Sequence, residues 1–238
     1  EDCCSAILGQ PGSGKSTLLG KAFLDHAQQS LERGSNRLPF YVSLRGRGID
    51  FSFSFEEYVN SCFATLFGKE MYPQIELTHV EPVFYMDGFD ELAEDIRKLD
   101  LRRLYDSDMF WRPFMLCCRS RFASEHLNEV TLGSRLSLIV ELQPWDEATT
   151  KRYIREFCRL QHREELADEI ENVFQEQPGM DEISTNPLLL TLFLWVVQES
   201  EMSLPLDVRG KRTLFDKCLE MWAKRELARL GMNGTPDG

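Results

Sequence analysis

Near the start of the chain, the stretch 9–17 reads Gly9-Gln10-Pro11-Gly12-Ser13-Gly14-Lys15-Ser16-Thr17. It matches the pattern G-x-x-x-x-G-K-[ST] at every fixed position. Glycines allow a tight turn in which backbone N–H groups face inward, and the following helix adds its positive end. We expect Lys15 to hold the β- and γ-phosphates of a nucleotide and the Ser16 hydroxyl to bind Mg²⁺. The sequence therefore predicts ATP or ADP with Mg²⁺ at Gly9–Thr17.

The surroundings of this loop favour the same interpretation. A short apolar strand is expected at 5–8, and an amphipathic helix is expected from Ser16 to about Ser30. A dinucleotide site would need G-x-G-x-x-G after its strand, and a guanine site would need N/T-K-x-D. The sequence contains neither motif at these places, so an adenine nucleotide is favoured.

An acidic turn follows a second apolar run. Val83 to Met86 predict a buried strand, and Asp87-Gly88-Phe89-Asp90-Glu91-Leu92 come directly after it. Ligands bind at the carboxyl ends of strands in open α/β sheets, so Asp87 is expected to hold Mg²⁺ opposite Ser16. Asp90 is expected to orient or deprotonate an attacking water, with Glu91 as the alternative.

Further apolar runs predict strands at 38–44, 113–118 and 136–142, with a loop at 46–53 and a helix at 55–67 between the first two. Such apolar strands, interleaved with helices, indicate a three-layer parallel sheet. After Pro144 only helices are expected, at 147–160 with Asp146 as N-cap, and at 164–176, 187–199 and 213–229. We predict an α/β core at 1–144, a helical domain at 145–230 and a flexible tail at 231–238.

Composition narrows the function classes. The formal net charge is −12 and no basic stripe is visible, which disfavours direct binding to nucleic acid or to an anionic membrane. The 7 cysteines include two adjacent pairs but no CxxC motif, so free thiols in a reducing cytosol are expected. The longest apolar run, 188–197, is about half a membrane span and reads as a core helix. With no signal peptide visible, we expect a cytoplasmic protein.

The string from Asp87 to Leu92 resembles the Walker B signature of NACHT domains, which belong to the STAND class of signalling NTPases. In that family a small residue follows the Mg²⁺-binding aspartate and an acidic pair comes just after it. Most AAA+ ATPases instead place a glutamate directly after the aspartate. Gly88 occupies that position here, which argues against an ordinary AAA+ motor.

Two later segments extend the resemblance. The stretch 114–122 is similar to the family's sensor 1 strand, which implies that Arg119, or failing that Arg121, reaches the γ-phosphate. The string 185–190 resembles a helical-domain motif whose proline, here Pro187, packs on the adenine. Pro187 also suits the first position of a helix. Trp145 and the segment 212–226 look like the corresponding parts of bacterial members of the family. Their aromatic side chains are expected in the core.

The resemblance implies an ATP/ADP switch that changes conformation, drives oligomerisation and acts in innate immunity or antiphage defence. Hydrolysis is expected to be slow, because no arginine finger in trans is evident. Both ends read as cuts in a larger protein, with effector and sensor domains outside this chain and self-association in the full-length protein. Two alternatives stay open: a self-sufficient AAA+-like motor, and a degenerate interaction module that needs no nucleotide. The intact Lys15, Ser16 and Asp87 speak against the second.

Overall fold

Five apolar strands form one parallel sheet. The computed structural model describes residues 4–44, 79–91, 112–127, 135–205 and 207–229. Within them the strands are β1 (Cys4–Gly9), β2 (Arg37–Ser43), β3 (Glu81–Asp87), β4 (Phe114–Arg119) and β5 (Leu136–Leu142). Of these, β1, β3 and β4 are buried at most of their positions. The strand order is β2-β3-β4-β1-β5, and every neighbouring pair is parallel. The expected parallel sheet is confirmed. The loop at 46–53, the helix at 55–67, Leu92 and the tail at 231–238 lie outside the described residues.

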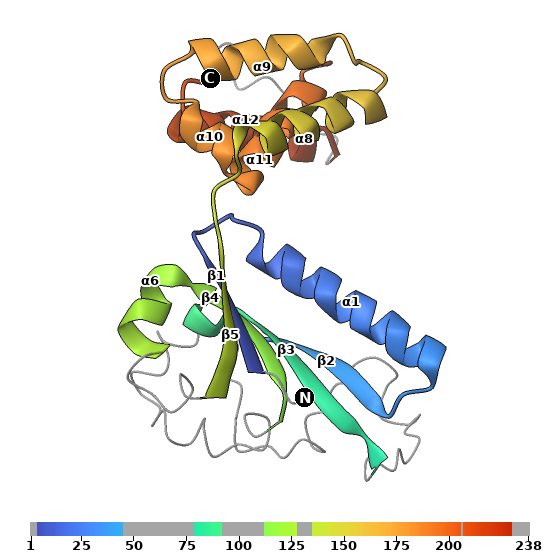
Figure 1. Cartoon of the computed structure of the whole chain (residues 1–238). Coiled ribbons are helices and arrows are strands. Elements are labelled where there is room, and N and C mark those ends of the chain that lie inside the picture. Colours follow the sequence, from blue (N-terminus) through green and yellow to red (C-terminus); the bar gives the residue numbers. More distant parts are fainter. Residues whose placement is uncertain (1–3, 45–78, 92–111, 128–134, 206, 230–238) are drawn as a thin grey trace. The chain divides into compact units, whose positions relative to one another are not determined.

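The sheet separates two apolar clusters, because neighbouring side chains on a strand point to opposite faces. On one face Ala6, Phe84 and Leu116 pack with residues from α6 (Ser120–Phe122) and the π-helix η2 (Ala123–Leu127). On the other face Ile7, Tyr85 and Cys117 pack against α1 (Lys15–Arg33). Figure 1 shows α1 along one face of the sheet and α6 beyond the other. Helix, sheet and helix thus form three layers.

The strand order brings three functional segments to one edge of the sheet. Gly9, the last residue of β1, is in register with Arg119 at the end of β4 and with Leu142 at the end of β5. Met86 of β3 is in register with Leu116 of β4, so Asp87 lies at the same edge. The carboxyl ends of parallel strands are where ligands bind in open α/β sheets.

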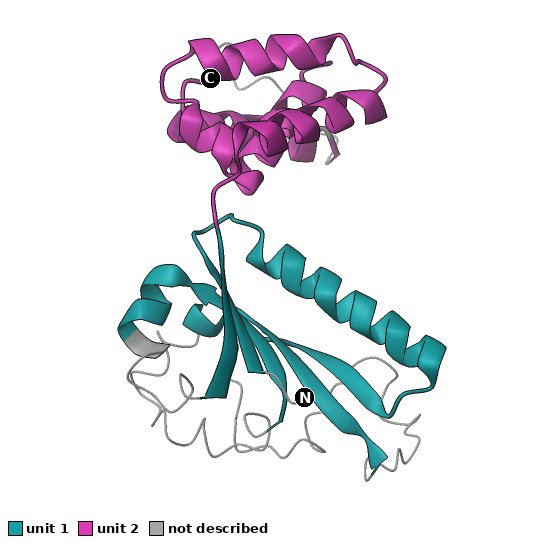
Figure 2. Ribbon diagram, viewed as in Figure 1, with its two compact units in different colours: residues 1–142 teal, residues 143–238 magenta. Residues whose placement is uncertain are grey.

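The chain divides into two compact units, residues 1–142 (unit 1) and 143–238 (unit 2), coloured separately in Figure 2. The described part of unit 2 is helical. Its helices are α8 (Glu147–Leu160), α9 (Leu166–Glu176), α10 (Asp181–Thr185), α11 (Pro187–Glu199) and α12 (Lys211–Arg229). The four expected helices are present. The 5-residue α10 was not expected, because it is too short for a helical period to stand out.

The expectation about aromatic residues is partly wrong. Trp145 packs on the unit 2 core, with its ring centroid 5.1 Å from that of Tyr153. Phe215 and Trp222, however, are 38% and 58% exposed. Leu214 and Cys218 are the buried residues of α12; Phe215 lies about 100° round the helix from Leu214, and Trp222 is exposed although it follows Cys218 by four residues on the same side.

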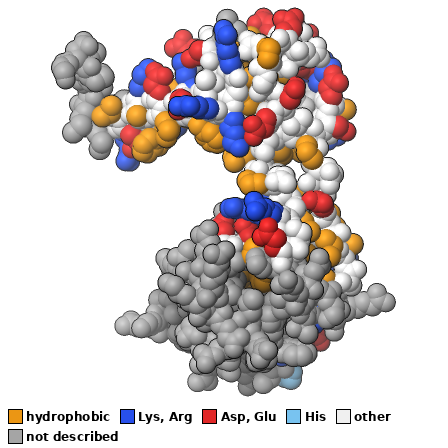
Figure 3. Space-filling view, turned by 90° about the vertical axis from the view of Figure 1, so that its left-hand side faces the viewer, with side chains coloured by type: hydrophobic (Ala, Val, Ile, Leu, Met, Phe, Trp, Pro, Cys, Tyr) orange, Lys and Arg blue, Asp and Glu red, His pale blue; other side chains and the backbone are white. Residues whose placement is uncertain are grey.

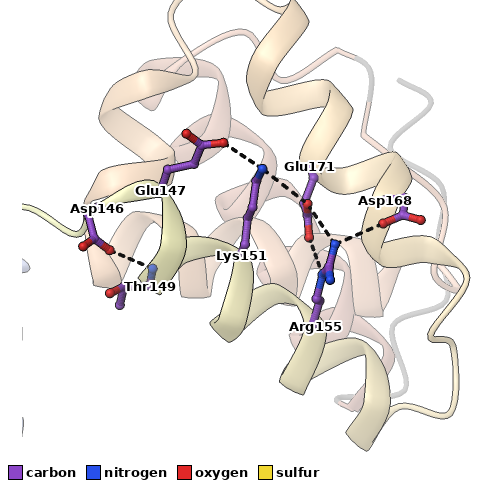
Figure 4. A network of polar contacts seen from close by, with 7 residues as sticks. All are labelled: Asp146, Glu147, Thr149, Lys151, Arg155, Asp168 and Glu171. Carbon is purple, nitrogen blue, oxygen red and sulfur yellow. Dashed lines mark hydrogen bonds and ion pairs between the residues drawn. The ribbon is translucent and has the colours of Figure 1, made fainter.

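Ion pairs join α8 to α9. The Arg155 guanidinium contacts both carboxylate oxygens of Glu171, with Nε–Oε1 at 2.9 Å and the second contact at 3.4 Å. Lys151 lies between Glu147 and the same Glu171 (Figure 4). Glu171 is buried, so these cations satisfy a carboxylate that water barely reaches. Lys151 and Arg155 of α8 therefore act within the fold, and Figure 3 shows acidic and basic side chains interspersed over unit 2 on the face drawn.

Five cysteines are buried free thiols, as expected: Cys4, Cys117, Cys118, Cys158 and Cys218. Burial raises the pKa of the Cys118 thiol to about 12, which keeps it protonated. Cys3 and Cys62 lie outside the described residues. Among the helices that the structure describes, none has the length and apolar character to cross a membrane.

Candidate functional site

The loop between β1 and α1 has the geometry of an anion cradle. Gly12 and Gly14 have φ angles of 78° and 93°, in the left-handed region that favours glycine. Gly14 is the N-cap of α1, so it has no side chain to accept hydrogen bonds from the first turn, and no acidic residue lies in that turn. The backbone N–H groups of this turn and the helix dipole are therefore directed at whatever lies before the helix.

The start of the loop is closely packed. A Cβ added to Gly9 would lie 2.6 Å from Ser13 Oγ and 3.3 Å from Leu142 Cβ. The Ser13 hydroxyl is buried and has no hydrogen-bond partner among the described residues. Only glycine fits at position 9 without moving these neighbours.

Lys15 points back over the loop. Its ammonium group donates to the carbonyl oxygens of Gly9 and Gln10, both at 2.8 Å. An ammonium group has three protons, so these two bonds leave one donor. Burial lowers the pKa of Lys15, and the nearby Asp90 carboxylate opposes that shift. The site therefore holds a half-buried cation at the mouth of the amide cradle, and a phosphate group would pair with it.

Ser16 and Asp87 meet across 71 positions of sequence. The Ser16 hydroxyl donates to Asp87 Oδ1 at 2.8 Å, and Asp87 is only 5% exposed. Adjacent ligands of an octahedral Mg²⁺ with bonds of 2.0–2.1 Å are about 3 Å apart, so these two oxygens fit one ion. Among the described residues, no group of three or more His, Cys, Asp or Glu side chains is arranged to hold a metal ion. Phosphates and water would supply the other ligands, which is usual for Mg²⁺.

The turn after β3 depends on Gly88. Its φ of 81° is left-handed, and the Glu91 N–H donates to its carbonyl at 2.9 Å. Phe89 is buried and stacks edge-on to Phe122, with ring centroids 6.0 Å apart. A glutamate at position 88 would be strained in this conformation. The resemblance pointed to a small residue here, and the backbone supplies the physical reason.

Asp90 and Arg119 form an ion pair that sequence reasoning missed. Asp90 Oδ2 lies 2.9 Å from Arg119 Nε, and Asp90 Oδ1 accepts from the Arg119 backbone N–H at 3.1 Å. The residues are 29 positions apart, and no local pattern signals the contact. Arg121, the alternative sensor, has an 89% exposed side chain and pairs with Glu125 on its own helical segment. Arg119 is thus the arginine that lies at the site.

Pro187 stands at the first position of α11, as helix geometry predicted. The Asn186 side chain caps that helix by accepting from the N–H groups of Leu188 and Leu189, at 3.1 and 3.2 Å. Pro187 belongs to unit 2, and its expected contact with adenine stays a prediction.

Known proteins share this architecture. The described parts resemble a Walker-type ATPase of Pyrococcus abyssi, 17% identical, covering 96% of this chain and 69% of that one with a TM-score of 0.52. The ORC1 protein of Aeropyrum pernix in complex with DNA is 12% identical, with 96% and 62% covered and a TM-score of 0.54. The ORC2 protein of the same organism in its ADP form is 14% identical, with 92% and 63% covered and a TM-score of 0.50. At such identities these likenesses show the fold alone.

No curated protein matches the sequence closely enough to count as a relative. The model of the family described as NACHT domain matches residues 4–161, which is more than half of the chain. Phosphate loop, acidic turn and strand order all lie within that match. The chain therefore belongs to the NACHT domain family and has a P-loop NTPase fold.

Proposed function

We propose that this chain is an ATP- and ADP-binding switch module that uses Mg²⁺. The contact between Ser16 and Asp87 at 2.8 Å carries the proposal, because two oxygen ligands at this separation suit one Mg²⁺ ion. Lys15 holds the β- and γ-phosphates, and the loop amides from Gly9 to Thr17 surround them. Asp90, or alternatively Glu91, prepares the attacking water, and Arg119 contacts the γ-phosphate.

Hydrolysis by the module alone is slow in this proposal, because no second chain supplies an arginine to the transferred phosphoryl group. ATP and ADP favour different placements of the helical domain, about 145–230, on the α/β core, about 1–144. Pro187 packs on the adenine and links the base to the helical domain. In the longer protein this change leads to self-association and to a signal in immunity or antiphage defence. Effector and sensor domains lie outside this chain.

Charge and cysteine chemistry support a nucleotide partner in the cytoplasm rather than nucleic acid or membrane. The net charge of −12 opposes binding to a phosphate backbone. The buried free thiols suit a reducing compartment. An AAA+-like motor is disfavoured because Gly88 has a left-handed conformation, in which the glutamate that most AAA+ ATPases carry directly after the aspartate would be strained.

The test compares Lys15→Ala with Lys21→Ala by calorimetric titration of MgATP and MgADP. Both lysines lie on α1, but Lys21 is exposed and pairs with Asp25. Loss of a charge-assisted contact is expected to weaken binding about 10- to 100-fold in Lys15→Ala. Lys21→Ala is expected to bind like the wild type. Equal affinities of Lys15→Ala and wild type would refute the site, and mass spectrometry of nucleotide released from purified protein provides an independent check.

A further inference from the structure

The Asp90–Arg119 pair is unequal in its exposure. The Asp90 side chain is 10% exposed, whereas that of Arg119 is 55% exposed. Both oxygens of this largely covered carboxylate contact Arg119: Oδ1 accepts a hydrogen bond from the backbone N–H, and Oδ2 forms the ion pair with Nε. Asp90 therefore contacts Arg119 twice, once at the backbone where β4 ends and once at the Nε side of the guanidinium group.

This geometry leaves the outer edge of Arg119 for a ligand. A guanidinium group is planar and has five N–H donors in a fixed fork, and Asp90 forms an ion pair with its Nε side. The terminal nitrogens of Arg119 have no hydrogen-bond partner among the described residues. The ion pair at Nε and the hydrogen bond to the adjoining backbone N–H restrain this planar group on one side, so the carboxylate limits the directions of the terminal donors.

The phosphate loop is electrostatically coupled to the pair. Asp90 raises the pKa of Lys15 and Arg119 lowers it, although burial is the largest influence. Asp90 thus interacts with two cations that would otherwise repel each other at the mouth of the loop. A carboxylate in this position reduces the repulsion between Lys15 and Arg119, the two cations expected to contact a triphosphate.

We propose that Asp90 is a positioning residue: it aims the terminal nitrogens of Arg119 at the γ-phosphate and so sets the preference for ATP over ADP. Water activation then belongs to Glu91. The inference rests on the proposed function, since it needs a nucleotide in the loop. It assigns to Asp90 a role in distinguishing nucleotides that does not require proton transfer.

The test measures the ratio of the Kd for MgADP to the Kd for the magnesium complex of ATP with an imido group between its β- and γ-phosphates. Asp90→Asn and Arg119→Ala are each expected to lower this ratio about tenfold, and the double variant no further. Asn keeps one oxygen for the Arg119 backbone N–H but presents an N–H₂ group to Nε, so the melting temperature should change little. Glu91→Gln, the neighbouring acid, should slow hydrolysis and leave the ratio unchanged.

The outcomes separate the two proposals. Additive effects of Asp90→Asn and Arg119→Ala on the ratio would overturn the positioning role. So would an Asp90→Asn variant that loses turnover while its ratio equals that of the wild type, because that is the behaviour of a base. A wild-type protein that binds neither nucleotide would overturn the proposed function, and this inference with it.

Discussion

Replacing Gly14 with alanine tests the conformation on which the phosphate site depends. Gly14 has φ 93° and ψ 11°, and an added Cβ would meet nothing within 4 Å. The cost is therefore conformational rather than steric. A non-glycine residue in a left-handed conformation costs about 1–2 kcal/mol. We expect Gly14→Ala to lower the free energy of unfolding of unit 1 by this amount.

Gly20 provides a matched control on the same helix. An added Cβ there also meets nothing within 4 Å, but Gly20 lies inside α1 in right-handed helical geometry. Alanine is better than glycine inside a helix by about 0.5–1 kcal/mol. The same methyl group should thus destabilise unit 1 at position 14 and stabilise it at position 20, a difference of about 2 kcal/mol.

Peptide-resolved hydrogen exchange is the suitable assay, because the two units need not unfold together. A difference of about 2 kcal/mol corresponds to a roughly 30-fold difference in the opening constant of amides in β1 and α1. Peptides from unit 2 serve as an internal reference and should not change. Nucleotide affinity should also fall in Gly14→Ala, since the loop amides lose their inward arrangement. Unchanged protection of β1 and α1 in Gly14→Ala would refute the left-handed turn.

Three further predictions concern single contacts. Asp87→Asn should keep the free energy of unfolding within about 1 kcal/mol of the wild-type value, because the amide oxygen still accepts from Ser16. It should abolish the Mg²⁺ dependence of ATP affinity in calorimetry. A retained Mg²⁺ response would exclude Asp87 as a ligand. Asn186→Ala should lower the unfolding free energy of unit 2 by about 1 kcal/mol in urea titrations followed by tryptophan fluorescence, through loss of the α11 cap; no change would mean that the cap is not formed. Hydrogen bonds from Thr149 hold the pKa of Asp146 below its ordinary value of 3.8. The ionised Asp146 carboxylate therefore stabilises α8 fully above pH 3.8, and this stabilisation is lost as the pH falls through the lowered pKa. Acid titration followed by circular dichroism should show a step that Asp146→Ala removes. An identical titration of that variant would contradict the assignment.

Most of the fold could be predicted from the sequence, because it depends on interactions between residues close together in the chain. The loop from Gly9 to Ser16 needs only its own glycines, lysine and serine to be recognised, because its backbone and side chains act within a few residues. Apolar strands and helices are periodic over short windows, so β1 to β5 and the long helices of unit 2 were placed to within a few residues. The acidic turn after β3 could be predicted in the same way, because it directly follows an apolar strand.

Tertiary structure alone decided which distant residues meet. Nothing in a local window says that β4 lies between β1 and β3, and that order is what joins Asp90 to Arg119 and Ser16 to Asp87. Nor could periodicity tell that Trp222 faces outward, since the inner face of α12 depends on what packs against it. Local hydrogen bonding and side-chain volume determine where a helix or strand forms. Contacts between residues tens of positions apart depend instead on which arrangement of the strands buries the most apolar surface.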